Sequence, residues 1–119
     1  MRPMSGTTVI IGAQWGDEGK GKIVDDLSDG RDAVFRYGGG ANAGHTIVVN
    51  GKKTVLHLLP SGITRPGLFN AVGPYVVCDP QILLDELKIS RECDSRVQLD
   101  LNAPVVLPLH KQLDEARER

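Results

Sequence analysis

A loop near the amino end has the residue types and the spacing of a phosphate-binding turn. The pattern of a glycine, four residues and then Gly-Lys is met by residues 16–22, Gly-Asp-Glu-Gly-Lys-Gly-Lys. An apolar run at residues 8–11 precedes it. A strand, a glycine-rich turn with lysines and a helix let backbone N–H groups converge on an anion at the positive end of the helix, while lysine supplies countercharge. The sequence therefore predicts a phosphate-binding turn at residues 16–22.

One position departs from the standard phosphate loop. Ile23 follows Lys22, where the standard pattern has Ser or Thr, whose hydroxyl holds a magnesium ion. Asp17 lies inside the loop and is the obvious replacement ligand, since carboxylates suit hard cations. The alternative is a glycine-rich turn that only lets a helix pack against a strand.

A second glycine-rich loop spans residues 38–46 and ends in Asn-Ala-Gly-His-Thr. Glycine permits close backbone approach to a ligand, and loops on a rigid sheet are where binding groups concentrate. His45 can donate a proton near neutral pH, although a lone loop histidine also has a solvated or structural interpretation. Because neighbouring strand ends in an open α/β sheet share one crevice, we expect both loops to meet there. An acid, lysines and a histidine in one phosphate-lined cleft are typical of phosphoryl transfer.

Strands and helices alternate along the chain, which indicates the α/β class with a mostly parallel sheet and an inserted β-hairpin. We expect strands at residues 7–13, 33–37, 75–78 and 105–107, helices at 19–28, 79–89 and 110–119, loop at 90–103, and a hairpin over 47–58. Asn50-Gly51 is the hairpin turn signal, and Asp79-Pro80 combines a helix cap with a first-turn proline.

The final expected helix has no capping residue and no partner. Residues 1–119 are therefore interpreted as the amino-terminal part of a single larger domain, with truncation inside that domain. A minimal domain that ends in a frayed helix is the alternative.

Composition and charge narrow the function classes. The 119 residues are 40% hydrophobic and 24% charged with a net charge of −1, which is typical of a soluble globular protein and argues against a nucleic-acid partner. No apolar stretch approaches membrane-spanning length, so no membrane partner is expected. Cys78 and Cys93 share no metal-ligand spacing and are expected to be free thiols in a reducing compartment. These features together predict a cytoplasmic protein.

Four segments resemble one family of enzymes. Residues 14–22 and 42–46 look like the two amino-terminal signatures of adenylosuccinate synthetase, and residues 36–39 and 54–62 are also similar to that family. The match runs from about residue 8 to the last residue and covers about the first quarter of the family's usual length. The resemblance implies a GTP-dependent ligase that joins IMP and L-aspartate through a phosphorylated IMP intermediate, uses Mg²⁺ and forms homodimers at full length.

The resemblance also implies roles for individual residues. Asp17 matches the base that removes a proton from the purine ring, His45 the donor to the developing oxyanion, and Lys20 the charge on the γ-phosphate. Asp17 and the carbonyl of Gly44 match the magnesium ligands. The implied GTP contacts are Gly16, Asp17, Glu18, Gly19, Lys20, Gly21, Lys22, Gly44, His45 and Thr46, and the implied IMP contacts are Asp17, Glu18, Gly19, Lys20, Asn42, Ala43, Gly44 and His45.

Two other functions stay open at this point. The chain is alternatively a generic phosphate-loop module that hydrolyses nucleotide without IMP, or a fragment without ligase activity. We expect the isolated 119 residues to have little or no activity. Gly38 departs from the glutamine of many family members, which puts one side-chain contact to substrate in doubt.

A few other polar residues receive structural interpretations. His57 and His110 are interpreted as packing or surface residues, and Asp25 and Asp26 as groups that cap or solvate the first helix. Arg65 can approach a ligand, but the sequence does not show that it does.

Overall fold

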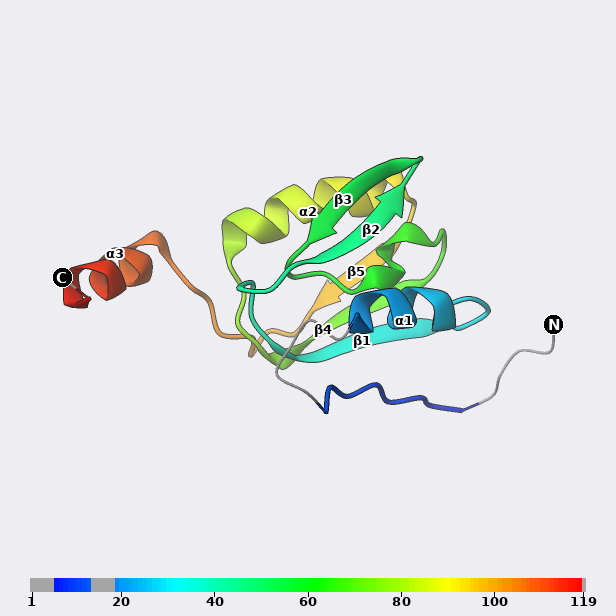
Figure 1. Cartoon of the computed structure of the whole chain (residues 1–119), viewed down its shortest axis with the longest axis horizontal. Helices are drawn as coiled ribbons and strands as arrows, with labels where there is room; N and C mark the ends of the chain where they lie inside the picture. The colour runs from blue at the N-terminus through cyan, green and yellow to red at the C-terminus, as the bar shows by residue number, and fades with distance from the viewer. Residues whose placement is uncertain (1–5, 14–18, 119) are drawn as a thin grey trace.

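The structure is a computed structural model that describes residues 6–13 and 19–118 (Figure 1). Its elements in chain order are α1 (Lys20–Leu27), β1 (Ala33–Gly39), β2 (His45–Val49), β3 (Lys52–Leu56), the 3-10 helix η1 (Ser61–Thr64), β4 (Phe69–Val76), α2 (Pro80–Glu92), β5 (Arg96–Leu99) and α3 (Pro108–Arg117). This composition of elements confirms the α/β class.

The main sheet has three parallel strands in the order β1-β4-β5. Its register shifts between Arg36, which pairs with Val72, and Gly38, which pairs with Tyr75. Tyr37 therefore lies opposite two residues of β4, Gly73 and Pro74, so β4 carries one extra residue here. Proline lacks an N–H and is tolerated in a sheet at such an irregularity. The strand β4 can therefore run through Pro74 and begin at Phe69, whereas the sequence predicted a strand only from residue 75.

The hydrophobic core lies on one face of this sheet, against α2, η1 and the β2–β3 hairpin. Its buried members are at most 4% exposed: Ile47, Leu56, Leu58, Leu59, Ile63, Val72, Val76 and Cys78. On the other face Phe35, Tyr37 and Tyr75 are 65%, 59% and 80% exposed. Alternate residues of β1 therefore point into the core and away from it, as strand geometry requires.

The hairpin confirms the turn chemistry that the sequence predicts. β2 and β3 pair antiparallel, with His45 opposite Leu56 and Val49 opposite Lys52. Asn50 and Gly51 both have positive φ, 49° and 76°, as a type I′ turn requires. The hairpin begins at His45, so its first residue is the histidine of the second glycine-rich loop.

Three secondary-structure predictions are wrong. Residues 6–13 form no strand, and Val9 and Ile11 are 68% and 71% exposed because no described strand pairs with this segment. Residues 90–103 are not one loop, since α2 continues to Glu92 and β5 follows. Residues 105–107 contain only an isolated bridge from Val105 to Cys78. The helix predictions at 19–28, 79–89 and 110–119 are confirmed with small boundary shifts.

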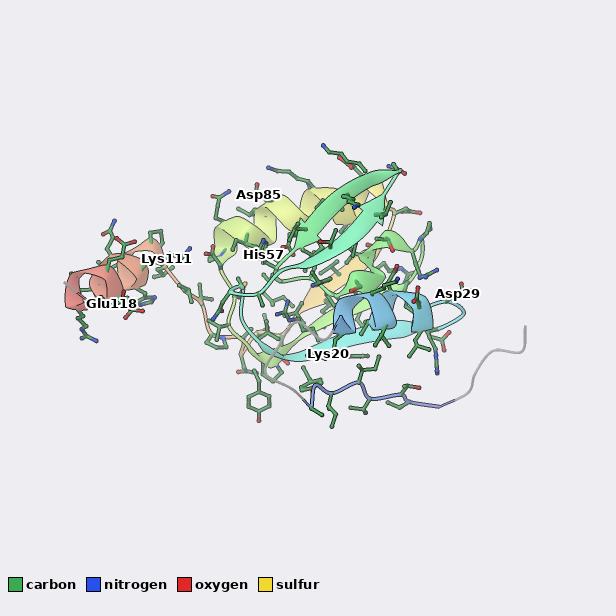
Figure 2. The ribbon with its side chains drawn as sticks, in the orientation of Figure 1. Lys20, Asp29, His57, Asp85, Lys111 and Glu118 are labelled. Carbon is green, nitrogen blue, oxygen red and sulfur yellow. The ribbon has the colours of Figure 1, made fainter. Side chains whose placement is uncertain are left out.

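The helix α3 projects from the body of the molecule (Figures 1 and 2). A hydrogen bond from Lys111 Nζ to Asp79 Oδ2 joins it to the capping residue of α2. His110 is exposed and its Nδ1 accepts the Leu107 N–H, so its role is local, as expected. Cys78 and Cys93 are free thiols. Within the described ranges no helix has both the length and the apolar character needed to cross a membrane.

Candidate functional site

The amino end of α1 supplies backbone donors. Gly19 precedes the helix with φ at +82°, a conformation that glycine adopts without strain. Its carbonyl accepts the N–H groups of Lys22 and Ile23 at 3.1 and 3.3 Å. No described side chain caps this end. The amino end of a helix carries partial positive charge on its first N–H groups, so this end suits an anion.

The second glycine-rich loop packs directly on this helix end. A Cβ placed on Gly21 would lie 2.6 Å from Cβ, 2.8 Å from Cγ and 2.9 Å from Cδ2 of His45. Only a residue without a side chain permits this approach. The expectation that the two loops meet is therefore confirmed for the described part of the first loop.

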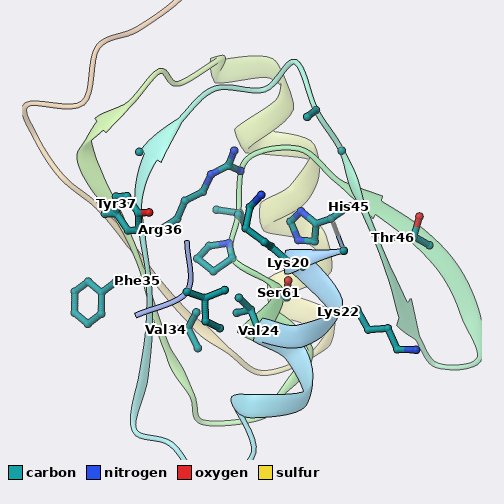
Figure 3. Close-up of a pocket in the computed structure, with 18 residues that line it drawn as sticks. Lys20, Lys22, Val24, Val34, Phe35, Arg36, Tyr37, His45, Thr46 and Ser61 are labelled. Atoms are coloured by element: carbon teal, nitrogen blue, oxygen red, sulfur yellow. The ribbon is translucent and has the colours of Figure 1, made fainter. Parts of the chain in front are cut away.

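A pocket of about 490 Å³ opens where the loops meet (Figure 3). Figure 3 shows Lys20 beside Arg36 and His45, whereas Lys22 and Thr46 point away from them. Of the site residues named from the sequence, the pocket is lined by Gly19, Lys20, Gly21, Lys22, Ala43, Gly44, His45 and Thr46. Asn42 is exposed and does not line it. Gly16, Asp17 and Glu18 lie outside the described residues.

His45 is half-buried, and its surroundings favour the neutral imidazole. Burial lowers the pKa of His45, and the nearby positive charge of Arg36 lowers it further, while Glu86 acts in the opposite direction. Its Nε2 is buried and has no hydrogen-bond partner among the described residues. A neutral imidazole with an unpartnered ring nitrogen can form a hydrogen bond to a bound group in the pocket.

Arg36 and Glu86 fix the backbone beside this pocket, a role not predicted from the sequence for either residue. Arg36 Nη1 donates to the carbonyls of His57 and Leu58 at 2.6 and 2.8 Å, and Nη2 donates to the carbonyl of Gly40 at 2.8 Å. The Glu86 carboxylate is 4% exposed and accepts the N–H groups of residues 57, 58 and 59 at 2.5 to 3.2 Å. One segment, residues 57–59, is therefore held from both sides.

A sequence signal for both residues exists. Glu86 interrupts the apolar stripe of α2 that contains Ile82, Leu83 and Leu87. Arg36 occupies an inward position of β1, two residues after Val34. A charged residue in a core-facing position needs a dedicated partner, and here backbone groups supply it.

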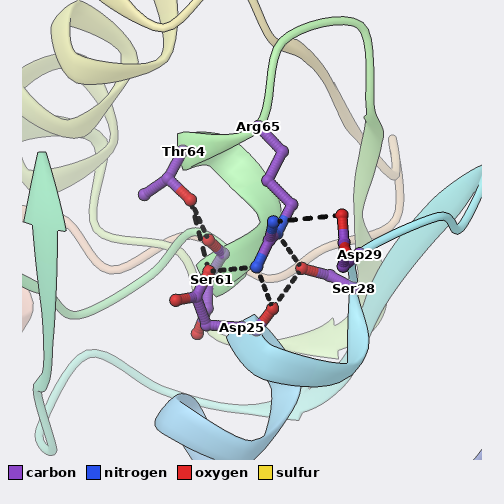
Figure 4. Close-up of polar contacts among 6 residues, drawn as sticks. All are labelled: Asp25, Ser28, Asp29, Ser61, Thr64 and Arg65. Atoms are coloured by element: carbon purple, nitrogen blue, oxygen red, sulfur yellow. Dashed lines mark hydrogen bonds and ion pairs between the residues drawn. The ribbon is translucent and has the colours of Figure 1, made fainter.

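The far end of α1 is anchored by Arg65 (Figure 4). Its Nη2 donates to the carbonyl of Asp25 and its Nε to Ser28 Oγ, both at 2.7 Å, and its guanidinium lies 3.5 Å from the Asp29 carboxylate. Asp25 also accepts a hydrogen bond from Thr64 Oγ1 at 3.3 Å. Arg65 thus joins α1 to η1 rather than reaching into the pocket.

Comparison with known proteins identifies the family. The family model of adenylosuccinate synthetase matches residues 9–119, nearly the whole chain. The chain belongs to the adenylosuccinate synthetase family. It is 54% identical over 117 residues to the adenylosuccinate synthetase of Anaeromyxobacter sp. (strain Fw109-5), which covers 93% of this chain. It is 52% identical over 120 residues to that of Acinetobacter baylyi, which covers 98% of the chain.

The three-dimensional fold agrees with this assignment. The fully ligated adenylosuccinate synthetase from Plasmodium falciparum superposes with a TM-score of 0.79 at 43% identity, over 90% of this chain and 26% of that protein. The succinoaminodeoxyadenylate synthetase of cyanophage S-2L, bound to dGMP and to dATP as an energy donor, gives 0.70 at 34% identity, over 87% and 30%. The chain spans about 27% of the length of these two bacterial relatives.

Proposed function

We propose that this chain is the amino-terminal part of an enzyme that ligates IMP and L-aspartate at the expense of GTP. The observation that carries the proposal is the contact of Gly21 with His45, because it brings both family signatures to one pocket. A generic phosphate-loop module needs the first loop only. Family membership and the ligase names of the relatives support the same reaction.

The proposed chemistry assigns one step to each polar group. Asp17 takes the proton from the purine ring nitrogen, so that the neighbouring carbonyl oxygen attacks the γ-phosphate of GTP. His45 donates a hydrogen bond to the oxygen on which charge develops, and Lys20 balances charge on the transferring group. The amino group of aspartate then displaces phosphate, which is a far better leaving group than the original oxygen. The GTP and IMP contact sets given from the sequence remain part of this proposal.

Mg²⁺ fits this site as an ion held mainly by phosphate and water. Among the described residues, no three His, Cys, Asp or Glu side chains gather in one place. Gly44 lines the pocket, and backbone carbonyls are suitable oxygen ligands. We propose the Gly44 carbonyl and the Asp17 carboxylate as protein ligands. The bound ion would neutralise charge on the phosphates.

The choice of purine donor and the assembly are also proposals. GTP is proposed from family membership, whereas the cyanophage relative uses dATP as its energy donor. We further propose a cytoplasmic homodimer at full length, to be tested by light scattering coupled to size exclusion. The 119-residue chain alone is proposed to lack turnover because it spans about 27% of its relatives and leaves one sheet face open.

The first experiment follows adenylosuccinate formation by ultraviolet absorbance with the full-length protein that contains this chain. IMP, L-aspartate, GTP and Mg²⁺ are omitted one at a time, and Asp17→Asn is assayed in parallel. We expect product only when all four are present, and none from the variant. Hydrolysis of GTP without IMP, and without adenylosuccinate in the complete mixture, would establish the generic module instead.

A further inference from the structure

His57 is a packing residue in the sequence-based interpretation, but the structure places it directly against the site. In the register of β2 and β3, His45 lies opposite Leu56, so position 57 faces position 44 across the hairpin end. A Cβ placed on Gly44 would lie 2.6 Å from Cγ1 of Val55, and 2.8 Å from Cε1 and 3.1 Å from Nδ1 of His57. The imidazole of His57 is therefore in close contact with the backbone of Gly44.

The backbone of His57 is fixed more firmly than an ordinary loop residue. Its N–H donates to Glu86 Oε1 at 2.5 Å, and its carbonyl accepts Arg36 Nη1 at 2.6 Å. Both partners carry full charges, which makes these hydrogen bonds stronger than neutral ones. The ring is thus carried on a backbone that is held on both sides, and Arg36 also holds the Gly40 carbonyl of the glycine-rich loop.

The loop that His57 contacts joins β1 to β2. Gly38 and Gly39 are paired within β1 and the Gly40 carbonyl is held by Arg36, whereas Gly44 has no Cβ to limit its backbone conformations. His57 Nδ1 is buried and lacks a hydrogen-bond partner among the described residues. This nitrogen gains no hydrogen bond from the described residues, so the contact with Gly44 is the interaction that the structure shows for the ring.

We propose that His57 is a positioning residue for the pocket. The contact of its ring with Gly44 holds the Gly44–His45 backbone in the position that the structure shows. The expected changes in kcat and in the Mg²⁺ requirement rest on the proposed function, whereas the positioning of the loop does not. Arg36 and Glu86 hold His57, and His57 holds the loop that carries His45. His57 does not line the pocket, so we assign it an effect that acts through the loop.

The test compares His57→Ala and His57→Phe with wild type in the full-length protein, with His110→Asn as a remote histidine control. We expect His57→Ala to lower kcat by about ten- to hundredfold and to raise the Mg²⁺ requirement, while KM for L-aspartate changes less than about twofold. His57→Phe keeps a ring against Gly44 and should recover most of the loss. His110→Asn should match wild type.

Hydrogen–deuterium exchange of residues 38–46 gives a readout that needs no turnover. Faster exchange in His57→Ala than in His57→Phe supports the positioning role, whether or not the wild type makes adenylosuccinate. A wild type that makes no adenylosuccinate would refute the proposed function alone. Unchanged exchange in His57→Ala overturns the positioning role. It is also overturned if an active wild type and His57→Ala share the same kcat, or if Phe loses as much activity as Ala.

Discussion

Replacing Gly21 by alanine separates two explanations of the same glycine. If Gly21 serves only as a flexible turn residue, alanine should stabilise α1 by about 1 kcal/mol, since glycine is a poor residue inside a helix. If Gly21 is required by its contact with His45, the new methyl group has no space. The two explanations predict opposite signs.

The distances give the expected magnitude. The new Cβ would lie 2.6 Å from His45 Cβ, and carbon atoms normally approach to about 3.5–4.0 Å, so one partner must move by about 1 Å. Overpacking of this kind costs about 1–3 kcal/mol, and the helix gain offsets about 1 kcal/mol of it. We therefore expect the free energy of unfolding to fall by about 0–2 kcal/mol. A catalytic group displaced by about 1 Å can lower the rate by about a hundredfold.

The assay is adenylosuccinate formation by the full-length variant, with a thermal melt of the same sample. Gly38→Ala is the matched control, because the nearest atoms to its Cβ are the oxygen and Cβ of Tyr75, at 3.7 and 3.8 Å, which is ordinary contact. We expect the control to keep its stability. A Gly21→Ala protein that is more stable than wild type and equally active would show that the contact with His45 does not constrain this site.

Three further predictions concern the supports of the site. Arg65→Met should lower the free energy of unfolding by about 1.5–3 kcal/mol, measured by urea titration, because it removes charged hydrogen bonds that tie α1 to η1; an unchanged midpoint would contradict this role. Glu86→Gln should cost about 1–3 kcal/mol in the same assay, since its NH₂ group would face backbone N–H donors, and equal stability would disprove the clamp. The hydrogen bond from Lys111 and those from backbone N–H groups lower the pKa of Asp79, so its contribution to stability is present above about pH 4 and is lost as the pH falls through the folded pKa. Asp79→Asn should flatten the acid side of the stability profile, and identical acid profiles would contradict the assignment.

Local signals in the sequence predict much of this fold. Asn50-Gly51 fixes the hairpin, and Asp79-Pro80 fixes the start of α2, where the Asp79 side chain accepts the N–H groups of Gln81 and Ile82. Both are decided by backbone conformation within four residues. The meeting of the two loops was also expected, although the strand at residues 7–13 on which that expectation was based is absent.

Structural features that depend on residues distant in the chain were not predicted from the sequence. Pro74 argues against a strand in the sequence. Only the register of β4 with β1 shows that this proline lies at an irregularity, where a strand tolerates it. The strand predicted for residues 7–13 is absent, since an apolar pattern does not by itself supply a neighbour to pair with. The core-facing positions of Arg36 and Glu86 indicate that each needs a partner, but only the fold shows that the partner is the backbone of residues 57–59.

That arrangement limits which pairs of residues positions 36 and 86 can tolerate together. Among the described residues, the hydrogen bonds of Arg36 go to carbonyl oxygens and those of Glu86 come from N–H groups, and the chain direction decides which side of the segment presents which group. In an ordinary ion pair the two charged residues can be exchanged, because each interacts with the other. Here each charged side chain interacts with the peptide groups between them. A reciprocal exchange would place the carboxylate against carbonyl oxygens and the guanidinium against N–H groups. An exchange of the two charges is therefore expected to lose the hydrogen bonds at both positions rather than to preserve an ion pair.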